Sequence, residues 1–144
     1  MNILSEIIAK KRERVAAARA SVPLDELRCE VTKPHALRSA LRGEGINIIA
    51  EFKRRSPSKG IIRADANLAE MVQSYESGGA VAISVLTEED YFDGSLADLR
   101  AVKSAVKLPV LRKDFVYEPF QVYERGPRAP ALSSSLSPCC SRPN

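Results

Sequence analysis

The feature that most constrains the fold of this chain is a short apolar segment that occurs three times, each time followed by a polar loop and a helical pattern. The three segments begin near residues 46, 80 and 109. Short runs rich in β-branched residues are typical of buried strands. Because strands alternate with helices, the pattern predicts right-handed βαβ units and a parallel sheet.

The segments between the strands carry helix boundary signals. We expect Asp65 to cap a helix that the Gly78–Gly79 pair ends, and Ser95 to cap the next one. Pro119 suits the first turn of a third helix. Residues 54–63 are expected to form a long polar loop. Together, residues 45–124 are predicted to hold three successive βα units.

Residues 1–44 precede these units and are predicted to form a helical extension. Residues 3–19 read as an amphipathic helix, and a second helical pattern covers residues 23–42. A basic amphipathic helix can lie on a membrane, but we favour packing on a globular core, with the charged side solvated. The side chains expected on that solvated side are Lys10, Lys11, Arg12, Glu13 and Arg14.

Composition restricts the function classes. The net charge is +4, but the last twenty residues hold three arginines and no acidic residue, so the remainder is nearly balanced with 19 basic and 18 acidic residues. A nucleic-acid-binding groove is therefore not expected. No apolar run is long enough to cross a membrane, and no secretory signal begins the chain. The three cysteines show no metal-ligand spacing. We expect a cytoplasmic protein.

Two parallel-sheet architectures fit three βα units, the doubly wound sheet and the (β/α)8 barrel. No glycine-rich dinucleotide fingerprint follows the first strand. Instead, charged residues stand at the carboxyl ends of all three strands, where a barrel places its active site. The sequence therefore predicts an α/β fold, part of a TIM (β/α)8 barrel. These strand-end residues are Glu51, Lys53, Glu88, Lys113 and Asp114.

Three motifs resemble those of the indole-3-glycerol-phosphate synthase family. Residues 49–60 read IAEFKRRSPSKG, residues 86–95 contain LTE and FDGS, and residues 109–115 read PVLRKDF. The helical leader also resembles the helices that precede the barrel in that family. The resemblance covers about residues 1–124, and it implies a carboxy-lyase of tryptophan biosynthesis. The implied substrate is 1-(2-carboxyphenylamino)-1-deoxyribulose 5-phosphate, with no metal or organic cofactor.

The resemblance implies ring closure with decarboxylation and dehydration, and three charged residues suit that chemistry. We expect Lys113 to act as the general acid toward the ketone oxygen. Lys53 is expected to hold the substrate carboxylate or phosphate. Glu51 lies two residues earlier on the same strand face, where it can orient Lys53 and assist the dehydration. The alternative is a simple structural ion pair between Glu51 and Lys53.

Three further residues are expected at the substrate. Ser56 and Ser58 offer hydroxyl and amide groups to anionic oxygens, although a Ser-Pro-Ser sequence is also a common turn. Phe92 is a candidate wall for the aromatic ring. The implied parent enzyme needs no partner beyond its phosphosugar substrate, and is either a monomer or part of a bifunctional chain.

The chain departs from the family pattern after residue 124. Residues 125–144 hold four prolines, five serines and two adjacent cysteines, which predicts a disordered tail and suggests translation in the wrong frame. A complete barrel needs about 250 residues, so this chain is expected to be an inactive fragment. The alternatives are a non-catalytic remnant or a half-barrel that acts only with a complementary fragment. A phosphoribosylanthranilate isomerase is disfavoured, because no strand end carries a cysteine.

Overall fold

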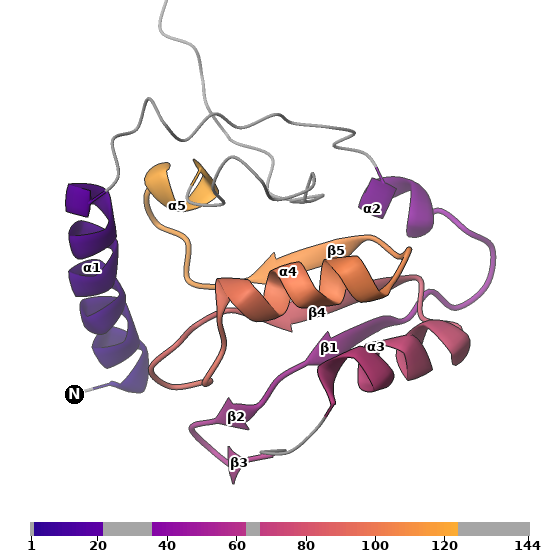
Figure 1. Ribbon diagram of the computed structural model, residues 1–144, viewed down its shortest axis with the longest axis horizontal. Helices are drawn as coiled ribbons and strands as arrows, with labels where there is room; N and C mark the ends of the chain where they lie inside the picture. Colours follow the sequence, from indigo (N-terminus) through magenta and orange to yellow (C-terminus); the bar gives the residue numbers. More distant parts are fainter. Residues whose placement is uncertain (1, 22–35, 63–66, 124–144) are drawn as a thin grey trace, which may run out of the picture.

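The computed structural model of the chain describes residues 2–21, 36–62 and 67–123. Ten helices and strands occur in these ranges, and Figure 1 shows their arrangement. Four sequence predictions lie wholly or partly outside the described residues. They are the first part of the helix expected over residues 23–42, the last residue of the loop expected over residues 54–63, the Asp65 cap and the tail of residues 125–144.

The centre of the fold is a three-stranded parallel sheet. It consists of β1 (Ile49–Phe52), β4 (Ala82–Leu86) and β5 (Val110–Lys113), in the order β1-β4-β5. Two helices, α3 (Leu68–Ser77) and α4 (Leu96–Ala105), cover one face of this sheet. The predicted βα alternation is confirmed, and the described part forms an open portion of a (β/α)8 barrel.

The helix caps are partly as expected. The hydroxyl of Ser95 accepts a hydrogen bond from the Asp98 amide at 3.0 Å, which confirms the predicted cap of α4. The residue that caps α3 is Asn67, whose side-chain oxygen accepts hydrogen bonds from two amides of the first turn. Helix α3 ends at Ser77 with Gly78 as its C-cap, and Gly79 has a φ of 89°, a left-handed conformation that suits glycine.

The hydrophobic core lies between the sheet and these two helices. Strand β4 is fully buried because it has a neighbour on each side and helices over one face. Side chains from all three strands contact the inner faces of α3 and α4, which explains their apolar helical spacing. The buried members of this core are Phe52, Val72, Ile83, Val85, Leu99, Val102 and Val110.

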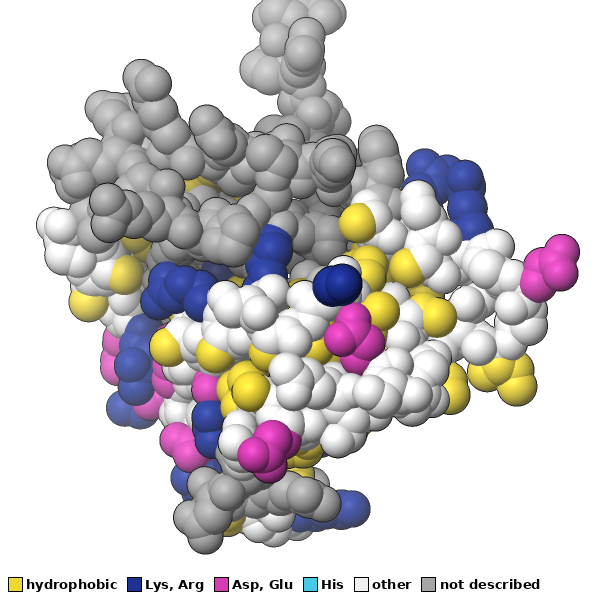
Figure 2. Space-filling model, turned by 45° about the vertical axis from the view of Figure 1, so that its right-hand side comes forward, with side chains coloured by type: hydrophobic (Ala, Val, Ile, Leu, Met, Phe, Trp, Pro, Cys, Tyr) yellow, Lys and Arg dark blue, Asp and Glu magenta, His cyan; other side chains and the backbone are white. Residues whose placement is uncertain are grey.

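The first strand is less buried than predicted. The apolar run of residues 46–53 was expected to be a buried strand, but β1 begins only at Ile49. Ile46 is 90% exposed, and Ile48 and Ile49 are also exposed. The prediction of burial was wrong for these residues because β1 stands at one edge of the described sheet, with β4 as its neighbour there. In the space-filling view of Figure 2, several hydrophobic side chains (yellow) lie at the surface of the molecule.

The loop expected over residues 54–63 contains regular structure. Strands β2 (Arg55–Ser56) and β3 (Gly60–Ile61) form a short antiparallel hairpin. The amide of Ile62 donates to the carbonyl of Arg54 at 2.8 Å and closes its base. Two-residue strands leave almost no periodic signal in a sequence, so the hairpin could not be read from the pattern.

The amino-terminal extension contains two described helices, α1 (Ile3–Ser21) and α2 (Ala36–Ala40). The predicted helix over residues 3–19 is thus confirmed. In Figure 1 the arrows of the three parallel strands point toward α1, so this helix stands beside their carboxyl ends. Val15 of α1 packs against Phe120 of the last helix, α5 (Phe120–Tyr123).

One residue of α1 departs from expectation. Lys11 was placed on the solvated side of the helix but is only 2% exposed. The neighbouring Lys10 keeps more than half of its side chain exposed, as expected. None of the described helices has the length and apolarity that a membrane span needs.

Candidate active site

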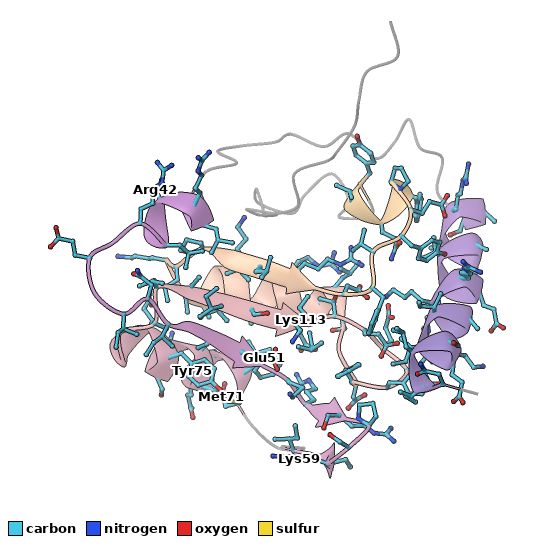
Figure 3. The ribbon with its side chains drawn as sticks, turned by 180° about the vertical axis from the view of Figure 1, so that it is seen from behind. Arg42, Glu51, Lys59, Met71, Tyr75 and Lys113 are labelled. Carbon is cyan, nitrogen blue, oxygen red and sulfur yellow. The ribbon has the colours of Figure 1, made fainter. Side chains whose placement is uncertain are left out.

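Residues at the carboxyl ends of β1 and β5 share one face of the sheet. Glu51 is paired with Ser84 of β4, and Lys113 is paired with Leu86. Since Ser84 and Leu86 are two residues apart, all four side chains point to the same face. Phe52, by contrast, belongs to the core beneath the helices. Glu51 and Lys113 are therefore on the face away from α3 and α4, which Figure 3 shows from behind.

Three charged residues meet on this face. The Lys113 ammonium donates a hydrogen bond to Oε2 of Glu51 at 2.5 Å. The Lys53 ammonium lies 3.0 Å from Oε1 of the same carboxylate. The Glu51 carboxylate is thus held between two cations, one directly after β1 and one at the end of β5. The Lys113 side chain is 55% exposed, so the group is open to solvent and to a ligand.

The ionisation of Glu51 follows from this arrangement. Partial burial acts to raise the pKa of Glu51, because it disfavours the charged form. The hydrogen bonds and charges of Lys113 and Lys53 outweigh burial and hold the pKa of this carboxyl below its ordinary value. At neutral pH, Glu51 is therefore an anion that can accept a proton but has none to donate.

The two serines lie in the hairpin that follows β1. The Ser56 hydroxyl is buried and accepts a hydrogen bond from the Lys59 amide at 3.2 Å. It also lies 3.5 Å from the Ser58 hydroxyl. Gly60, with a φ of 65°, lets the chain turn back into β3. The Ser56 hydroxyl thus helps to close the turn, while Ser58 is exposed.

Phe92 lies in the loop after β4. Its ring stands 6.5 Å from the ring of Phe115, centroid to centroid, with the planes tilted by 40°. Its backbone carbonyl accepts a hydrogen bond from the Arg55 amide at 3.2 Å, which ties the loop to the hairpin. The structure therefore brings Glu51, Lys53 and Lys113 into direct contact, and places the other candidates on adjoining loops.

Glu88 organises the loop that carries Phe92. The sequence placed Glu88 only at a strand end, but its side chain is completely buried. Its carboxylate accepts hydrogen bonds from the amides of Asp90, Tyr91 and Phe92 at 3.1, 2.8 and 3.2 Å. A buried polar group needs such donors. The sequence signal that could have found this role is an acidic residue just before a short turn.

A second cluster, in which the side chains are largely buried, surrounds Asp114, the residue that follows Lys113. Asp114 has no exposed side-chain surface and forms ion pairs with Lys11 at 2.9 Å and Arg112 at 2.7 Å. It also accepts a hydrogen bond from the Thr87 hydroxyl at 2.8 Å. Burial acts to raise the pKa of Asp114, but the charges of Arg112 and Lys11 outweigh it and keep the pKa low. Sequence reasoning missed this cluster because it unites three distant segments.

The described residues contain no cluster of three potential metal ligands of the His, Cys, Asp or Glu type. The candidate site residues at the carboxyl ends of the strands and in the adjoining hairpin offer ammonium groups, a carboxylate and hydroxyls. Such a set can bind an anionic ligand and move protons. With the parallel sheet and its helices, it defines an open part of a (β/α)8 barrel with a candidate site at the carboxyl ends of its strands.

Comparison with known proteins gives the family. The sequence pattern of indole-3-glycerol phosphate synthase matches residues 4–128. The indole-3-glycerol phosphate synthase of Mycolicibacterium vanbaalenii is 48% identical over 125 residues, which cover 85% of this chain and 46% of that protein. Indole-3-glycerol phosphate synthase 1 of Streptomyces coelicolor is 48% identical over 127 residues, covering 86% and 47%. The chain belongs to the indole-3-glycerol phosphate synthase family, a family of carboxy-lyases.

A third relative shows similar coverage. The enzyme of the same name from Bacteroides thetaiotaomicron is 44% identical over 126 residues, covering 85% of this chain and 48% of that protein. The chain therefore spans about half the length of the relatives it matches. The predicted family resemblance is confirmed.

Proposed function

We propose that this chain supplies the amino-terminal half of the active site of an indole-3-glycerol phosphate synthase. The observation that carries the proposal is the Glu51 carboxylate held between the Lys53 and Lys113 ammonium groups. The family membership supports it. The proposed substrate is the phosphosugar 1-(2-carboxyphenylamino)-1-deoxyribulose 5-phosphate, and the expected setting is the cytoplasm, with no metal or organic cofactor.

The first step of the proposed reaction needs a proton donor. The aryl carbon that bears the carboxylate attacks the ketone carbon, and the ketone oxygen becomes a hydroxyl by taking a proton from Lys113. The bond to the carboxylate then breaks, CO2 leaves, and its electron pair restores the aromatic ring. Finally the new hydroxyl takes a proton and leaves as water, while the adjacent carbon loses a proton and the indole double bond forms.

The other two residues take different parts in this scheme. Lys53 is less exposed than Lys113 and is proposed to hold an anionic group of the substrate. Glu51 is an anion, so it is proposed to orient both lysines and to accept the proton released in the dehydration. Ser56, Ser58 and Phe92 are proposed to contact the substrate from the adjoining loops.

This half of the site is proposed to be insufficient alone. The described sheet has three strands, whereas a (β/α)8 barrel closes with eight and takes catalytic groups from the ends of several of them. We expect the purified chain to form no detectable indole-3-glycerol phosphate from the carboxyphenylamino substrate. Clear turnover by a homogeneous preparation would contradict this part of the proposal.

The decisive experiment supplies the complementary half. The full chain is co-refolded with the carboxyl-terminal half of the Streptomyces coelicolor relative, and product formation is measured by indole fluorescence. Activity that needs both parts, that Lys113→Met abolishes and that Lys107→Met preserves, would support the proposal. Lys107 is a suitable control because it is exposed and precedes β5 at its opposite end. Inactivity of every mixture would favour the alternative, a non-catalytic remnant.

A further inference from the structure

Lys11 is a buried lysine for which the proposed chemistry has no use. Its side chain is 3% exposed, although it belongs to a helix whose neighbouring lysine is solvated. Its ammonium lies 2.9 Å from Oε2 of Glu89 and 2.9 Å from Oδ1 of Asp114. One ammonium group therefore bridges the loop after β4 and the turn after β5.

Each of these partners is adjacent to a candidate site residue. Asp114 directly follows Lys113 in the chain. Glu89 directly follows Glu88, whose carboxylate binds the amide of Phe92. The segments that carry Lys113 and Phe92 are thus both attached to the same side chain of α1, beside the carboxyl ends of the strands (Figure 1).

The need to neutralise the carboxylates of Asp114 and Glu89 does not explain why Lys11 is buried. Asp114 already has the Arg112 guanidinium at 2.7 Å and the Thr87 hydroxyl at 2.8 Å. Glu89 keeps a third of its side chain exposed and can be solvated. Because burying an ammonium is costly, a buried ion pair is weak evidence for stability, and an apolar side chain often serves as well. What Lys11 adds is a fixed spacing between two loops.

We propose that Lys11 is a positioning residue, which acts from the amino-terminal helix to hold Lys113 and Phe92 at a fixed separation. The catalytic part of this inference rests on the proposed function, since it takes Lys113 as the proton donor. Two other ion pairs attach α1 to the same side of the sheet, between Arg14 and Asp90 and between Arg19 and Glu118. Both involve exposed arginines, so Lys11 is the buried contact among these three.

The first test uses the full chain alone and needs no activity. In Lys11→Met, amide hydrogen exchange in the segments 88–92 and 114–117 is expected to rise about tenfold, while the buried amides of β4 stay unchanged. Lys10→Met is the matched control, because Lys10 is exposed and forms its ion pair within α1, with Glu13 at 3.8 Å. Equal exchange in Lys11→Met and Lys10→Met would overturn the proposal, whatever the chain's activity.

The second test uses the co-refolded enzyme. Lys11→Met is expected to lower kcat ten- to hundredfold with little change in KM, since a small misplacement of a catalytic group costs rate. Val15→Ala loosens the packing of α1 on Phe120 but keeps Lys11 and both of its carboxylate partners, and it should lose stability while keeping kcat. A Val15→Ala variant with the same loss of kcat, or a Lys11→Met variant with normal kcat, would overturn the proposal. An inactive unsubstituted mixture would instead refute the proposed function and leave the exchange test to decide the position of Lys11.

Discussion

Two clusters with the same pattern of charges stand at the carboxyl edge of the sheet, and they differ in burial. In each, one carboxylate is held between two cations. Glu51 lies between Lys53 and Lys113 at the surface, whereas Asp114 lies between Lys11 and Arg112 in the interior. The Lys113 side chain is 55% exposed and the Asp114 side chain is not exposed at all. Lys113 and Asp114 are adjacent in sequence, but the Lys113 side chain points to solvent and the Asp114 side chain points to the interior.

The different burial of the two clusters affects how readily their ion pairs can exchange partners. An exposed ion pair is weak and can exchange its partner for a ligand, because water screens the charges. A buried one resists the loss of either partner, because the remaining charge has no solvent. The Glu51 cluster is therefore open to a ligand, whereas the Asp114 cluster holds together the segments around it.

The largest effect is expected from Lys113→Met in the co-refolded enzyme. Loss of a general acid lowers the rate by about 10²- to 10⁴-fold. Both kcat and kcat/KM should fall, because the interaction strengthens in the transition state. Steady-state kinetics with the carboxyphenylamino substrate measure both constants.

Lys53→Met tests whether the two lysines of the exposed cluster have different roles. If Lys53 holds an anionic group of the ground state, KM should rise with a smaller change in kcat. The reverse outcome, in which Lys53→Met abolishes kcat and Lys113→Met raises only KM, would mean that the two roles are exchanged. If neither variant mattered, the site would lie elsewhere.

Asp114→Asn tests the buried cluster. Removing one partner of a buried pair costs about 3–5 kcal/mol of unfolding free energy, which urea unfolding followed by circular dichroism can measure. Glu51→Gln, the matched change at the surface, should cost less than about 1 kcal/mol. Failure of Asp114→Asn to fold would agree with the expectation, whereas equal costs in the two variants would refute the contrast.

The dependence of stability on pH gives a smaller effect with a defined sign. The pKa of Asp114 is lowered in the folded chain, so its contribution is complete well above the unfolded value of about 3.9 and is lost as the pH falls through the folded value. The free energy of unfolding should therefore decline below about pH 5. Asp114→Asn should flatten this decline. If the variant lost stability at low pH as steeply as the unsubstituted chain, Asp114 would not be its cause.

Much of the fold could be predicted from local signals. The strands around 82–86 and 110–113, the Ser95 cap and the glycine pair after α3 follow from residue type and spacing over a few positions. The exposure of β1 and the β2–β3 hairpin could not be predicted. The first depends on which strand stands at the edge, and the second is too short to show a period.

In the candidate site too, some features could be predicted from the sequence and others could not. The motif placed Glu51, Lys53 and Lys113 at strand ends, and parallel strands bring such ends to one edge. The sequence by itself therefore determined the family, the βα order and the charged residues at the strand ends. The tertiary structure alone decided that Lys11 is buried beside Asp114, and that Lys113 shares Glu51 with Lys53. Ion pairs between segments some 60 to 100 residues apart depend on how helices and loops pack, and no local period records that packing.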